Sequence, residues 1–77
     1  MPGKALYWDF FGPDAEGTAV HFRKHLEEFL VAEAVDGCEL ALESAGPGHS
    51  AICCRTPEPA LALLTQRLRP RRARPLE

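Results

Sequence analysis

Two histidines have the spacing of a metal-binding pair. His21 and His25 lie four residues apart in a segment with helical periodicity, so both rings can reach one ion from a single helix turn. His49 or a cysteine would supply the third ligand. However, the pair lies on the flank and outer side of the expected helix, and Cys53 and Cys54 point to opposite faces of their strand. A metal or thiol site built on His21, His25 and a cysteine is therefore an alternative, and we assign no cofactor.

The remaining reactive residues do not form a recognisable catalytic set. The glycines at positions 12 and 17 have nearly the spacing of a phosphate-binding loop, but the lysine of such loops is absent. Asp14 and Glu16 in this loop would repel a phosphate, whereas carboxylates at the start of a helix are stabilising. No pair of catalytic groups converges on a predicted pocket, so we expect no enzymatic activity.

Positive charge is concentrated at the end of the chain. Residues 1–66 contain four basic and ten acidic side chains, a net charge of −6, whereas residues 67–77 contain five arginines and one glutamate. A basic segment can neutralise phosphates, which makes nucleic-acid contact a second alternative function. The acidic body would oppose it, and no aromatic residue lies among the arginines to stack on bases. The arginines concerned are Arg67, Arg69, Arg71, Arg72 and Arg74.

The apolar pattern predicts the element order β-α-β-β-α. Alternation, helical spacing of apolar residues, and turn residues such as Gly12-Pro13 and Gly46-Pro47-Gly48 delimit the elements. The predicted strands cover residues 6–11, 38–44 and 50–56. The first helix starts at residue 15 and ends at Asp36-Gly37, and the second starts at Thr56-Pro57 and ends at Pro70.

The two middle strands form a hairpin whose register follows from its loop. Centring the loop on Pro47 places aliphatic pairs on one face and an opposite-charge pair on the other. A slip of one residue would move every side chain to the wrong face. The predicted pairs are Leu42–Ile52, Leu40–Cys54, Ala41–Cys53 and Glu39–Arg55.

These elements predict a single α+β domain over residues 1–69. A right-handed crossover gives a two-layer sandwich with a three-stranded sheet of order 1-3-2 and both helices on one face. This arrangement resembles a ferredoxin-like plait lacking its fourth strand. Residues 70–77 are expected to be a basic, disordered tail, and Leu76-Glu77 resembles a cloning remnant. The odd number of cysteines and the lack of an apolar signal core predict reduced thiols in the cytoplasm.

The first strand is apolar on both faces, which suggests a binding surface. Leu6, Trp8 and Phe10 would face the helices, leaving the other face of the sheet and the outer edge of this strand uncovered. We therefore predict a protein-interaction module that forms a homodimer or homo-oligomer, or binds another protein. No apolar run approaches the roughly 20 residues that cross a membrane. The predicted partner-binding residues are Tyr7, Asp9, Phe11, Ala41, Cys53 and Arg55.

Overall fold

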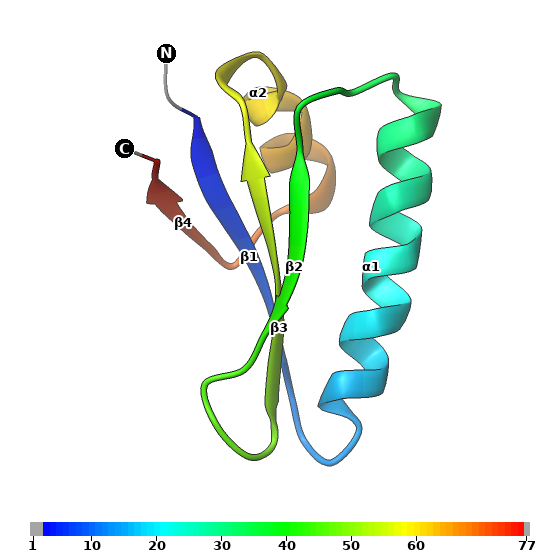
Figure 1. Ribbon diagram of the computed structural model, residues 1–77, viewed down its shortest axis with the longest axis vertical. Coiled ribbons are helices and arrows are strands. Elements are labelled where there is room, and N and C mark those ends of the chain that lie inside the picture. The colour runs from blue at the N-terminus through cyan, green and yellow to red at the C-terminus, as the bar shows by residue number, and fades with distance from the viewer. Residues whose placement is uncertain (1–2, 77) are drawn as a thin grey trace.

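The computed structural model describes residues 3–76, which form a four-stranded antiparallel sheet and two helices (Figure 1). The strand order is β2-β3-β1-β4. Both helices contribute to one core on the same face of the sheet. In chain order the elements are β1 (Lys4–Phe11), α1 (Ala15–Ala32), β2 (Glu39–Glu43), β3 (His49–Thr56), α2 (Glu58–Leu68) and β4 (Arg72–Pro75).

The prediction of a three-stranded sheet is wrong. The segment from Arg72 to Pro75, which we expected to be disordered, forms β4 and pairs antiparallel with β1. The element order is therefore β-α-β-β-α-β, that of a complete ferredoxin-like plait. Strand β4 has no apolar alternation of its own. It forms because the outer edge of β1 offers unpaired backbone N–H and C=O groups to any segment that α2 delivers beside it.

The hairpin of β2 and β3 has the predicted register. Leu42 lies opposite Ile52 and Ala41 opposite Cys53, and the other two predicted pairs are also present. Strand β3 then pairs with β1, so these two strands occupy the centre of the sheet. The three predicted strands thus lie in the expected order, with β4 added beyond β1.

The main core lies between the sheet and the helices. Leu6 and Trp8 of β1 pack with Ile52 of β3, and Leu26 and Leu64 supply the matching positions on α1 and α2. This agrees with the predicted orientation of β1. The indole Nε1 of Trp8 donates a hydrogen bond of 2.9 Å to the carbonyl of Leu68, which satisfies one of the free carbonyls at the end of α2.

Helix α1 ends earlier than predicted. Its last residue is Ala32, and Gly37 lies beyond it in the connection to β2. Ala34 adopts the left-handed conformation, with φ of 56°, in place of the expected glycine. Its N–H bonds to the carbonyl of Val31, and the N–H of Val35 bonds to the carbonyl of Leu30. These two bonds form a Schellman motif, which is favoured here because Val35 packs against the core.

Candidate functional site

The sheet face that lies opposite the helices is called here the open face. Side chains from β4 and from the residue after it cover part of this face. Tyr7 is only 7% exposed and Cys53 only 5% exposed, although both were predicted to contact a partner. The guanidinium of Arg72 lies 4.4 Å from the centroid of the Tyr7 ring, and Leu76 packs against Ala5, Tyr7 and Cys53. The chain's own side chains therefore cover the middle of the apolar strip.

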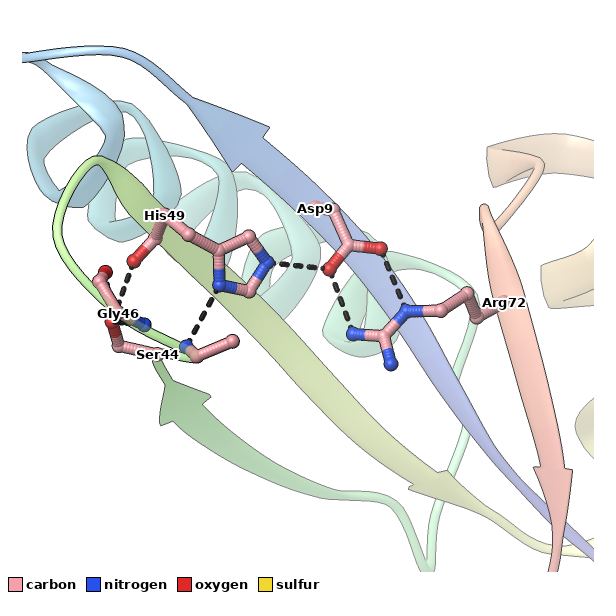
Figure 2. Close-up of polar contacts among 6 residues, drawn as sticks. Asp9, Ser44, Gly46, His49 and Arg72 are labelled. Atoms are coloured by element: carbon pink, nitrogen blue, oxygen red, sulfur yellow. Dashed lines mark hydrogen bonds and ion pairs between the residues drawn. The ribbon is translucent and has the colours of Figure 1, made fainter.

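Asp9 is the centre of a polar cluster on the open face (Figure 2). Arg72 donates two hydrogen bonds to it, from Nε to Oδ2 at 2.9 Å and from Nη2 to Oδ1 at 2.7 Å. His49 Nε2 lies 2.8 Å from Oδ1. The carboxylate is 8% exposed, and the hydrogen bonds from Arg72 lower the pKa of Asp9 in spite of the opposing effect of burial. Asp9 thus links three strands: β1, β3 and β4.

Both ring nitrogens of His49 are engaged. The backbone N–H of Ala45 donates to Nδ1 at 2.9 Å, so Nδ1 is an acceptor and Nε2 carries the proton that is donated to Asp9. The hydroxyl of Ser44 also donates to the carbonyl of His49, at 2.6 Å (Figure 2). No lone pair of the ring is free in this arrangement, because Nδ1 accepts from Ala45 and Nε2 donates to Asp9. The Asp9–His49 pair fastens the β2–β3 loop to β1.

Three of the predicted partner-binding residues remain accessible on the open face. Phe11 is 68% exposed at the end of β1, where its ring centroid lies 5.1 Å from that of His49. Ala41 and Arg55 are also exposed. The contribution of Arg72 to this face was not predicted. The two-residue spacing of Arg72 and Arg74 was the available signal, since residues at that spacing share one face of a strand.

The register separates the charges of the open face. Glu39, Arg55, Ala5 and Arg74 form one row across the four strands. Glu39 is at the β2 end of this row and Arg74 is at the β4 end. The other charged side chains of the two outer strands on this face follow the same division, with Glu43 on β2 and Arg72 on β4. One edge of the open face is therefore acidic and the other is basic.

The positions of Cys53 and Cys54 do not favour the alternative metal site with a cysteine ligand. His21 and His25 do approach one another, but Cys54 is buried in the core and Cys53 lies on the open face, away from the helices. Burial raises the pKa of the Cys54 thiol to about 12 and also raises that of Cys38, which disfavours the thiolates that bind metals. Within residues 3–76, no three or more His, Cys, Asp or Glu side chains are grouped as metal ligands.

The arginines that suggested nucleic-acid binding are distributed over different surfaces. Arg67 lies on α2 with its guanidinium 5.7 Å from the centroid of the Phe29 ring. Arg69 is the C-cap residue of α2, and Arg72 bonds to Asp9. The segment therefore does not present its charges as one continuous stripe.

Comparison with known proteins gives no family for this chain. No protein-family model matches it, and neither the curated proteins nor the solved structures contain a match. The ferredoxin-like strand order does not indicate a function, because this fold supports many unrelated ones. Neither helix within residues 3–76 is long and apolar enough to span a membrane. Function must be inferred from the open face itself.

Proposed function

We propose that the chain is a non-catalytic interaction module that binds a second copy of itself through the open face. The outer edge of β1, which we had also predicted to bind a partner, is excluded because β4 pairs with it. The new outer edge is protected in turn. Strand β4 has only four residues, among them two arginines and a proline, and such short charged edges discourage further pairing.

The separation of charge across the open face carries this proposal. A two-fold axis parallel to the strands would lay β2 of one copy over β4 of the other. Glu39 of each copy then faces Arg74 of the other, because the two residues lie in the same row. A two-fold axis perpendicular to the strands would instead place β2 on β2 and bring Glu39 against Glu43, which is repulsive. The open face is complementary to itself in the first arrangement only.

The area of the open face determines how tightly two copies should associate. Four strands about 4.8 Å apart, with eight residues in the longest at about 3.3 Å each, give a face of roughly 500 Å² per copy. Stable interfaces bury about 800 Å² per partner, so this dimer should be weak and in rapid exchange. The exposed ring of Phe11 would lie over His49 of the second copy and supply the main apolar contact. Micromolar or weaker affinity is expected.

Charge reversal tests the arrangement. Sedimentation equilibrium over a concentration series should show a monomer–dimer equilibrium that Glu39→Arg and Arg74→Glu each weaken at least tenfold. The double variant should recover most of the affinity, because the inter-copy pair is restored with its charges exchanged. Glu33→Arg makes the same change in charge just beyond α1 and is the matched control.

Urea denaturation of each variant separates loss of association from loss of folding. Glu39 also lies 3.7 Å from Arg55 in its own chain, but both side chains are exposed and the pair should contribute little to stability. A wild-type chain that stays monomeric at millimolar concentration would refute the proposal. So would a double variant that associates no better than either single variant.

A further inference from the structure

We propose that His21 and His25 form a two-histidine site for Ni²⁺ or Cu²⁺ on the exposed side of α1. The two Nε2 atoms are 3.0 Å apart, and the ring centroids are separated by 4.5 Å in an edge-to-face arrangement. This site is independent of the proposed self-association, because α1 covers the sheet face opposite the open face.

The distance between the nitrogens fits a shared metal ion with ligands about 90° apart. With metal–imidazole bonds of about 2.0–2.1 Å, nitrogens 3.0 Å apart subtend an angle of about 90–97° at a shared ion. This is close to the angle between neighbouring ligands in square-planar or tetragonal sites, which are typical of Cu²⁺ and Ni²⁺. A tetrahedral Zn²⁺ site would need the two nitrogens roughly 3.3–3.4 Å apart. The pair therefore favours Ni²⁺ and Cu²⁺ over Zn²⁺.

A neighbouring carboxylate supports this use of the rings. Oε1 of Glu28 lies 3.6 Å from Nδ1 of His25, on the opposite side of that ring from His21. Histidines that bind metals commonly direct their second nitrogen to a carboxylate, which orients the ring. Only one proton can lie between the two Nε2 atoms, and the metal would replace it. Water would complete the coordination, since both histidines are exposed.

Metal binding at this site should depend on the helix. The four-residue spacing holds the rings together only while residues 21–25 are helical, so the ion binds the folded chain in preference to the unfolded one. The ion should consequently raise the melting temperature. Two chain ligands are fewer than the three or four of structural or catalytic zinc sites, so the bound metal should exchange freely.

Calorimetric titration of the tag-free chain with NiCl₂, and separately with ZnCl₂, tests the site. We expect one Ni²⁺ per chain, bound more tightly than Zn²⁺, and at least tenfold weaker binding in His21→Asn and in His25→Asn. A composition-matched control exchanges two neighbours, with Val20→His and His21→Val together. It retains three histidines but separates two of them by five residues, on different sides of the helix.

The exchanged variant should bind Ni²⁺ as weakly as His21→Asn while retaining the helical circular dichroism of the wild type. Nickel affinity that survives the exchange would show that other groups hold the ion and would overturn the proposal. Zinc binding tighter than nickel binding would overturn it as well. If the exchanged variant loses helical signal, the comparison of His25→Asn with the wild type decides the result.

Discussion

Replacing Arg72 tests whether its bidentate contact with Asp9 holds β4 on the sheet. All four residues of β4 are exposed, so burial contributes little to its attachment. The side chain of Arg72 links β4 to the rest of the sheet through two hydrogen bonds to Asp9 and through the contact between its guanidinium and the Tyr7 ring. We expect Arg72→Ala to loosen β4 without unfolding the core.

The magnitude follows from the exposure of the two partners. Exposed ion pairs contribute about 0.2–1 kcal/mol, and Arg72 is 49% exposed. Asp9, however, is only 8% exposed, and hydrogen bonds to charged groups contribute about 1.5–3 kcal/mol. The contact with Tyr7 adds about 0.5–1 kcal/mol. After allowance for solvent screening of the arginine, we expect Arg72→Ala to cost about 2 kcal/mol. Arg72→Lys should recover less than half, because an ammonium cannot form the two-pronged contact.

Native-state hydrogen exchange measures this effect at β4 directly. The Arg71 N–H bonds to the Tyr7 carbonyl at 2.8 Å, and the Leu76 N–H bonds to the Gly3 carbonyl at 3.2 Å. A local loss of about 2 kcal/mol corresponds to roughly thirtyfold faster exchange at these amides. Amides of the central strand β3 should change much less. Urea denaturation gives the corresponding global value.

Arg71→Ala is the matched control, since it removes an exposed arginine next to the same strand. It should change stability by no more than about 0.5 kcal/mol. The reasoning would be refuted if Arg72→Ala accelerated exchange no more than Arg71→Ala did. Full protection of β4 in Arg72→Lys would refute it too, because positive charge alone would then be sufficient.

Two further predictions concern Ala34 and Asp9. Ala34→Gly should raise the free energy of unfolding by about 0.5–1 kcal/mol in urea denaturation, because φ at this position is 56° and glycine adopts that conformation without strain. The control Ala32→Gly, inside α1, should lower the free energy of unfolding. A lower free energy of unfolding for Ala34→Gly would contradict the left-handed conformation of Ala34. Because the folded pKa of Asp9 lies below its ordinary value of 3.8, its stabilising effect is complete above about pH 5 and is lost as pH falls through the folded pKa. The stability difference between the wild type and Asp9→Asn should therefore shrink on acidification from pH 6 to pH 2.5, and a difference that stayed constant would show that the carboxylate charge is not responsible.

The spacing of apolar residues along the chain was sufficient to predict the elements whose side chains alternate between core and solvent. The register of the β2–β3 hairpin was predicted correctly, because a slip of one residue would have turned Leu40 away from the core. The stop of α1 was placed too late. Gly37 is a better residue than Ala34 for the left-handed conformation, but the packing of Val35 against the core decided where the helix ends.

The candidate site could be predicted only in part from the spacing of residues along the chain. Alternation along β1 correctly placed Tyr7, Asp9 and Phe11 on one face, but it could not show which of them the chain itself covers. Tyr7 is covered by Arg72, which is 65 positions later in the chain, and Asp9 bonds to His49 and Arg72 from two other strands. Neither partner has a local spacing that points to Asp9.

The sequence by itself determined the two helices, the hairpin and the division of β1 between a core face and an open face, because each follows from the periodicity of neighbouring side chains. Only the tertiary structure determined that residues 72–75 form a strand, because their sequence Arg-Ala-Arg-Pro has no preference for one. These residues form β4 because they lie beside the edge of β1, whose backbone they pair with, and beside the carboxylate of Asp9, to which Arg72 bonds. The same contact closes the edge of β1 and creates the basic side of the open face.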